Sequence, residues 1–244
     1  MRRNLEIFQI IIPENFACLK KDLKDTSSPN EEYLLAPPRL PRLPARKHRR
    51  VDIAEEVEFI EHYKPGGYHP VELFDVLDGR FEVISKLGQG GISTAWLCYE
   101  LKTKQWKAMK INAASHSSPK CSDLRVLELF RERLVDSSEL MKNHICVATD
   151  TFWIDRPNGR HLCSVLPVLG PTLEDLRLEL ATLTESKRIK SACSQMAKGL
   201  DFLHRHSVCH GGFRPQNVLM QLKEGVLNQI SKENMIEQLK KKEL

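Results

Sequence analysis

The sequence predicts an α+β fold in which an antiparallel sheet with one helix comes first and a helical part follows. Strand-like runs alternate with turn signals between residues 81 and 168. Apolar residues then recur at helical spacing between residues 185 and 205. Between the first two strand-like runs lies a glycine-rich stretch, Leu87 to Ser93. Because a dinucleotide fingerprint opens a helix and this stretch opens a strand, it predicts a hairpin loop that can approach a phosphate closely.

The remaining elements follow from periodicity and turn residues. Two helices are predicted from apolar spacing, over residues 124–134 and 185–205, and Thr172 is expected to cap a short helix over 172–183. A polar tail over 225–244 is predicted to be helical, with a loose apolar stripe at Ile230, Met235, Ile236 and Leu239. The predicted strands cover residues 81–86, 95–99, 106–111, 146–153 and 161–168, with turns at 102–105 and 156–159.

The helix over residues 185–205 carries a broad apolar stripe, which we interpret as core. If no later helices cover it, the exposed stripe predicts aggregation or a partner. The stripe consists of Ile189, Ala192, Cys193, Met196, Ala197, Leu200 and Leu203.

Composition narrows the class of protein. With 41% hydrophobic and 28% charged residues and no apolar run near ~18 residues, we expect no membrane span. Seven cysteines without a CxxC pair favour a reducing compartment and argue against zinc. A net charge of +5, concentrated in one run, does not imply direct binding to nucleic acid. We therefore expect a location in the cytoplasm, the nucleus or both.

Residues 1–50 show no sustained periodicity and are expected to be disordered or weakly structured. They contain a Pro/Arg-rich linker in which Pro38 and Pro41 have PxxP spacing, compatible with an SH3-type ligand or a plain linker. The basic cluster at 45–50 is compatible with nuclear import or with a solvated linker. Residues 51–80 form a lead-in to the sheet.

Three stretches together resemble one family. The run from Tyr63 to Val71 reads Tyr-Lys-Pro-Gly-Gly-Tyr-His-Pro-Val, the glycine-rich stretch leads to Trp96, and a strand carrying Lys110 follows. This order is similar to that of serine/arginine-protein-kinase-like serine/threonine kinases, fungal members especially. The resemblance implies a protein-kinase-like fold with a complete amino lobe and hinge over 81–170, only the start of a helical carboxyl lobe over 171–222, and a helical tail over 223–244.

The resemblance also implies an ATP site. The glycine loop would cover the phosphates and Lys110 would pair with them, held by an acidic partner at Asp123, with Glu128 as the alternative. In the hinge, Leu166 would line the back of the adenine pocket, while the Pro167 carbonyl and the Leu169 amide would meet the adenine edge. The implied ATP-binding residues are Leu87, Gly88, Gln89, Gly90, Gly91, Ser93, Ala95, Ala108, Lys110, Pro167, Leu169 and Leu219.

The stretch from Val208 to Leu219 lines up with the kinase catalytic loop His-Arg-Asp-Leu-Lys-Pro-Glu-Asn. His210, Pro215 and Asn217 match in register, and Asn217 is the implied Mg²⁺ ligand. Gly212 stands where the family has its catalytic aspartate, so the base position has no side chain. In the same loop, Gly211 replaces an arginine and Arg214 replaces the lysine that touches the γ-phosphate.

No Asp-Phe-Gly follows Asn217, which suggests a chain stopped early. The resemblance then implies a serine/threonine kinase-family domain that is incomplete and inactive in this chain, with weak ATP binding and doubtful Mg²⁺ binding. The alternative is a pseudokinase acting as a nucleotide-binding or scaffolding module. The implied partner is a protein, either a substrate or a scaffold partner, and the family's substrates are Arg/Ser-rich proteins.

Overall fold

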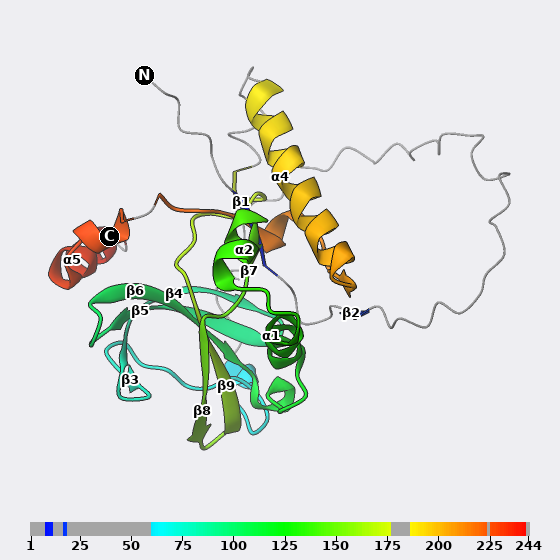
Figure 1. Cartoon of the computed structure of the whole chain (residues 1–244). Coiled ribbons are helices and arrows are strands. Elements are labelled where there is room, and N and C mark those ends of the chain that lie inside the picture. Colours follow the sequence, from blue (N-terminus) through cyan, green and yellow to red (C-terminus); the bar gives the residue numbers. More distant parts are fainter. Residues whose placement is uncertain (1–7, 12–16, 19–59, 177–185, 224, 243–244) are drawn as a thin grey trace, which may run out of the picture.

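A six-stranded antiparallel sheet organises the part of the chain that the computed structural model describes, residues 8–11, 17–18, 60–176, 186–223 and 225–242. Its strand order is β3-β4-β5-β6-β9-β8, and Figure 1 shows it as one curved layer. The strands are β3 Val76–Leu77, β4 Phe81–Gly90, β5 Ser93–Glu100, β6 Gln105–Asn112, β8 Asp150–Arg156 and β9 Gly159–Leu166.

Side chains on one face of this sheet form an apolar core beneath the lead-in. Alternation along β6 buries Met109 and Ile111 on this face, because successive side chains of a strand point to opposite sides. Their buried neighbours from the other strands are Leu77, Phe81, Val83, Trp96, Cys98, Cys163 and Val165. The α+β class and the antiparallel order are therefore confirmed.

A second core lies where the helices meet. Helix α1 (Ser122–Glu132) buries Val126 and Phe130, and α2 (Ser137–Lys142) buries Leu140. They join Ile145 of β7 (Ile145–Cys146), Val208, and Phe202 and Leu203 from the end of α4 (Ser186–Arg205). The predicted strand over 146–153 is thus divided into β7 and β8.

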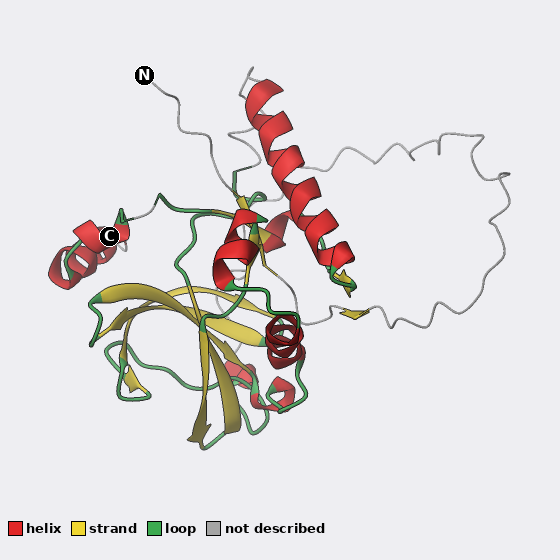
Figure 2. Ribbon diagram, in the orientation of Figure 1, coloured by secondary structure: helices red, strands yellow, loops and turns green. Residues whose placement is uncertain are grey.

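Helix α4 matches the predicted bounds within one residue, and the core interpretation is confirmed for part of the stripe. Ala192 is buried against Val218 with Met196 packed beside it, and Leu203 lies in the second core. For three other positions of the stripe the core interpretation is wrong. Ile189, Cys193 and Ala197 are exposed, although they occupy the apolar stripe. Figure 2 shows the reason, since the first turns of this long helix extend away from the strands. Only the second half, with Phe202 and Leu203, reaches the second core.

Two small sheets of short strands lie beside the helical part in the described residues. Strand β1 (Phe8–Ile11) lies between β11 (Val218–Met220) and β7, and β2 (Ala17–Cys18) pairs with β10 (Val208–Cys209). The sequence predicted no structure for either amino-terminal segment. The Pro/Arg-rich linker and the basic cluster lie outside the described residues.

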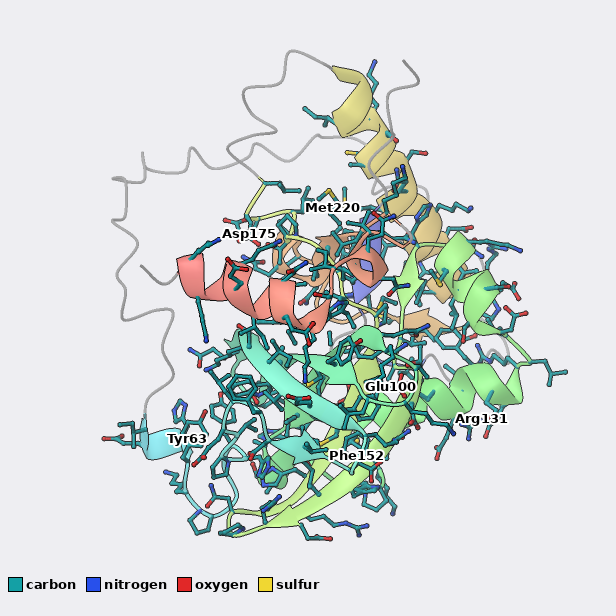
Figure 3. The ribbon with its side chains drawn as sticks, turned by 90° about the vertical axis from the view of Figure 1, so that its left-hand side faces the viewer. Tyr63, Glu100, Arg131, Phe152, Asp175 and Met220 are labelled. Atoms are coloured by element: carbon teal, nitrogen blue, oxygen red, sulfur yellow. The ribbon has the colours of Figure 1, made fainter. Side chains whose placement is uncertain are left out.

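The tail folds back onto the sheet, which the sequence did not predict. Helix α5 (Lys232–Lys242) buries Met235 against Ile84, Leu97 and Trp106, with Ile230, Ile236 and Leu239 at the edge. The Trp106 indole Nε1–H donates to the Ile230 carbonyl over 3.1 Å, and Lys232 pairs with Glu82 at 2.9 Å. Figure 3 shows α5, in salmon, lying above the strands of the sheet.

Short 3₁₀ turns link these elements: η3 Ile60–His62, η4 Ala114–His116, η5 Pro215–Asn217 and η6 Leu227–Gln229. The short helix predicted over 172–183 is a turn over its described part, residues 172–176, and the rest lies outside the described residues. Thr172 and Asp175 still make the expected capping contacts, at 3.1 Å from the Asp175 amide to Thr172 Oγ1. Among the described helices, none is long and apolar enough to cross a membrane.

Candidate functional site

The glycine-rich stretch forms the hairpin between β4 and β5. Gly88 pairs with Ala95 and Gly90 pairs with Ser93, so the turn falls at Gly91. Gln89, Gly90 and Gly91 are exposed and Leu87 is 49% exposed, which leaves the loop backbone open to a ligand. This is the strand, glycine loop, strand arrangement that the sequence predicted.

Lys110 and Asp123 form an ion pair below this hairpin. Lys110 Nζ lies 2.9 Å from Asp123 Oδ1, with the two side chains 19% and 16% exposed. Asn112 Nδ2 donates to the other carboxylate oxygen over 2.9 Å, which fixes the carboxylate between two donors. Glu128, the alternative partner, is exposed on α1.

The hinge lies beside the strand that follows the catalytic loop. The Gly170 amide donates to the Met220 carbonyl over 2.8 Å, and Thr172 bridges to Leu219. In the view of Figure 3, Asp175 and Met220 both lie above the sheet. Ala95 pairs with Lys110, and Ala108 lies two residues before Lys110 on β6, so these two half-buried alanines lie on the face that carries Lys110. Ala108 also pairs with Leu166 at the end of β9. Pro167 and Leu169, which follow Leu166 in the sequence, are half-buried.

The catalytic-loop stretch is held in shape around Gly212. His210 is 2% exposed, and its Nδ1 accepts from the Gly212 amide at 3.3 Å. Asn217 Nδ2 donates to the Gly212 carbonyl over 2.8 Å. Arg214 is exposed, and Gly211 has φ of +73°, which favours glycine there. The loop thus has an ordered backbone and no side chain at its base position.

These residues do not complete a magnesium site. Asn217 uses its amide nitrogen on Gly212, which leaves one amide oxygen as a ligand. Within the described residues, no group of three or more His, Cys, Asp or Glu side chains could hold a metal ion. Mg²⁺ prefers several oxygen ligands in octahedral geometry, and among these residues Asn217 would supply one of them.

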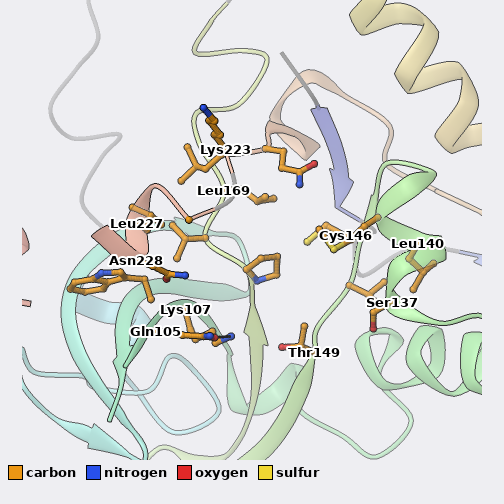
Figure 4. Close-up of a pocket in the computed structure, with 18 of the residues that line it drawn as sticks. Gln105, Lys107, Ser137, Leu140, Cys146, Thr149, Leu169, Lys223, Leu227 and Asn228 are labelled. Carbon is orange, nitrogen blue, oxygen red and sulfur yellow. Dashed lines mark hydrogen bonds between the residues drawn. The ribbon is translucent and has the colours of Figure 1, made fainter. Parts of the chain in front are cut away.

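A cavity of about 340 Å³ lies beside the hinge, and sequence reasoning missed it. Figure 4 shows Cys146 and Leu140 on one side, Leu227 and Asn228 on the other, and Leu169 between them. Its lining shares only Pro167 and Leu169 with the predicted ATP-binding residues. Residues of the folded-back tail, among them Leu227 and Asn228, line the cavity, and no local sequence pattern predicted the position of this tail.

A buried pair of histidines lies behind the ion pair. His161 Nδ1 lies 3.0 Å from the Asn112 carbonyl, and the His69 and His161 rings are 5.1 Å apart. Burial, together with the neighbouring His161 and Arg156, lowers the pKa of His69 to about 4, although Asp75 opposes the shift. Burial also lowers the pKa of His161. Both rings are therefore neutral near pH 7, and they join the lead-in to the strand that carries Lys110.

Comparisons with known proteins agree with this geometry. The profile of the family described as protein kinase domain matches residues 81–231. Human SRSF protein kinase 3 is 32% identical over 189 residues, which are 73% of this chain and 32% of that protein. Protein kinase dsk1 of Schizosaccharomyces pombe is 34% identical over 178 residues, 71% of this chain and 32% of its own.

Two further matches broaden the comparison. Serine/threonine-protein kinase spk-1 of Caenorhabditis elegans is 32% identical over 173 residues, 69% of this chain and 17% of its own. A crystal structure of another kinase domain superposes with a TM-score of 0.52 at 22% identity, covering 64% of this chain and 44% of that one, which supports the fold alone. The chain spans at most about a third of the length of these curated relatives. The chain belongs to the protein kinase domain family and is similar, within it, to the SRSF-type protein kinases.

Proposed function

We propose that this chain is a nucleotide-binding kinase-family module that binds ATP and transfers its phosphate poorly or not at all. The ion pair between Lys110 and Asp123, 2.9 Å long below an open glycine hairpin, carries the proposal. A lysine held by a carboxylate beneath such a loop is the arrangement that kinases use on the phosphates of ATP. The adenine would lie against Ala95 and Ala108 at the hinge.

Poor transfer is inferred from Gly212. A positioned base contributes about 10²- to 10⁴-fold to the rate, and glycine offers no group that can accept the proton of a substrate hydroxyl. The loop keeps its shape through His210 and Asn217. Its departure from the family is therefore chemical, which favours a pseudokinase over a kinase with a distorted loop.

The proposed partner is a protein. The relatives named SRSF protein kinase suggest an Arg/Ser-rich one, and the exposed apolar row Ile189, Cys193 and Ala197 of α4 gives a surface that could contact it. This scaffolding role is the second candidate function, because it needs no phosphate transfer.

Thermal unfolding with and without ATP tests nucleotide binding. ATP should raise the melting temperature, because a ligand that binds only the folded state stabilises it, and Mg²⁺ should add little. The change Lys110→Ala should abolish the shift. Lys102→Ala is the control, because Lys102 is exposed in the turn between β5 and β6.

An ATP shift that is equal in Lys110→Ala and in the unchanged protein would overturn this site. A rise in melting temperature that occurs only when Mg²⁺ is present would contradict the prediction that Mg²⁺ adds little to ATP binding.

A further inference from the structure

Within the lead-in, residues 66–68 are hydrogen-bonded to the sheet at the end where the glycine loop turns. The amides of Ala114 and Ser115, just after β6, donate to the carbonyls of Gly67 and Gly66 over 2.9 and 2.8 Å. On the other side, the Gly66 amide donates to the Asn158 carbonyl over 2.7 Å, and Asn158 Nδ2 donates to the Tyr68 carbonyl over 2.8 Å. The segment is thus fixed to two different turns of the sheet.

The two glycines are required by this route. Gly66 has φ of +85°, and a Cβ on Gly67 would lie 1.9 Å from the His62 carbonyl oxygen. The same close turn lets the Tyr68 amide donate to the His62 carbonyl over 2.9 Å. Pro-Gly-Gly therefore forms a tight turn that aims the next side chain, Tyr68.

Tyr68 is held rigidly and reaches the glycine loop. Tyr68 is only 4% exposed, and the rings of His62 and Tyr63 pack edge-on against its ring, with centroid distances of 5.4 and 5.8 Å. Its hydroxyl donates to the Gly90 carbonyl over 2.6 Å, across 22 positions of sequence. Gly90 itself is exposed at the open end of the hairpin, so this bond joins the rigid lead-in to the part of the loop that faces solvent.

We propose that Tyr68 is a positioning residue that holds the glycine-rich loop in its ligand-ready conformation, with the lead-in as its rigid base. The inference rests on the proposed nucleotide site for its functional meaning. Glycine-rich backbone loses more conformational freedom on ordering than other residues. Because a hydrogen bond already orders Gly90 in the free protein, the loop should lose less conformational entropy when a phosphate binds.

The first test needs no nucleotide. Backbone amide hydrogen exchange is compared in peptides covering residues 87–93 between the unchanged protein and Tyr68→Phe, which keeps the ring and removes only the hydroxyl. Exchange in the loop should rise by about fivefold, the opening expected on losing one hydrogen bond. Tyr99→Phe is the matched control, because Tyr99 lies on β5 at the end remote from the loop.

The proposal that Tyr68 holds the loop would be overturned if amide hydrogen exchange in residues 87–93 is unchanged in Tyr68→Phe, or if it rises equally in Tyr99→Phe. If exchange rises throughout the amino-lobe sheet, the hydroxyl supports the domain as a whole and the proposal fails as well.

The second test separates the phosphates from the base. Because the loop is expected to cover phosphates, Tyr68→Phe should weaken ADP binding about fivefold and change adenosine binding less than twofold. An equal loss for both ligands would contradict a role through the loop. If the unchanged protein binds neither ligand, the proposed function fails, while the exchange experiment still decides whether Tyr68 holds the loop.

Discussion

The Lys110 side of the candidate site and the Gly212 side are both ordered, but only the first carries the side chains its chemistry needs. On the first side, Lys110, Asp123 and Asn112 form a connected set of charged and polar contacts. On the second, His210 and Asn217 hold the backbone of residue 212, which has no side chain of its own. Loop shape is thus maintained independently of the catalytic group, and binding and transfer can be lost separately.

The largest expected effect concerns the turn at Gly67 in the lead-in, which is hydrogen-bonded to the chain just after β6, the strand that carries Lys110. Gly67→Ala should destabilise the fold by about 3 kcal/mol, since its Cβ would fall 1.9 Å from a backbone oxygen that cannot move aside easily. Chemical denaturation measures the loss. Gly91→Ala is the control, because a Cβ there meets nothing within 4 Å, and an equal effect of both changes would contradict the account.

The next effect is a loss of stability in acid. With the folded pKa of His69 lowered to about 4 from an ordinary value of 6.5, the unfolded state binds the proton more readily. The contribution of neutral His69 is complete above pH 6.5, is lost as the pH falls, and levels off below about 4. Between pH 7 and pH 4.5 the loss is on the order of 2 kcal/mol.

Denaturation at pH 7 and pH 4.5 measures this change, and His69→Gln should flatten the slope. Exposed His116 provides the control change, His116→Gln. A slope that persists in His69→Gln would assign the acid sensitivity to other groups.

A smaller effect distinguishes the two acidic residues of α1. Asp123→Ala should weaken ADP binding about tenfold, because Lys110 loses the carboxylate that aims it, and a hydrogen bond to a charged group is worth about 1.5 kcal/mol or more. Glu128→Ala should leave binding unchanged. Equilibrium titration with ADP compares the two, and the reverse order would reinstate Glu128 as the partner.

The smallest effect is expected on the other side of the site. Gly212→Asp should change ADP affinity less than twofold, since residue 212 takes part in the loop through its backbone amide and carbonyl. The same titration measures it. A tenfold loss would mean that the two sides are coupled and that the comparison between them is too simple.

Sequence patterns predicted the elements whose information is local. Turn residues predicted the hairpin of β8 and β9, and the spacing from the glycine loop predicted the strand that carries Lys110. The position of Asp123 followed from motif register, and the observed contact occurs there. These features depend on neighbours in sequence or on a fixed motif.

The remaining features depend on contacts between distant segments. Periodicity identified the apolar face of α4, yet it could not say that Ile189 and Cys193 would lack a cover. Nothing local indicated that Met235 would pack against Trp106, or that Tyr68 would reach Gly90. Such contacts are decided by how turns direct whole elements, which a single sequence does not encode in its periodicity.

The most direct test measures ATP binding and phosphate transfer in the same sample. The protein is mixed with an Arg/Ser-rich peptide and with ATP labelled on its γ-phosphate. The nucleotide bound to the protein and the label transferred to the peptide are then measured separately in the same sample, and the experiment is repeated with Lys110→Ala. The account predicts bound ATP that is lost in Lys110→Ala, with peptide labelling at background in both. Peptide labelling that is clear in the unchanged protein and absent in Lys110→Ala would contradict it, because transfer would then proceed without a side chain at residue 212.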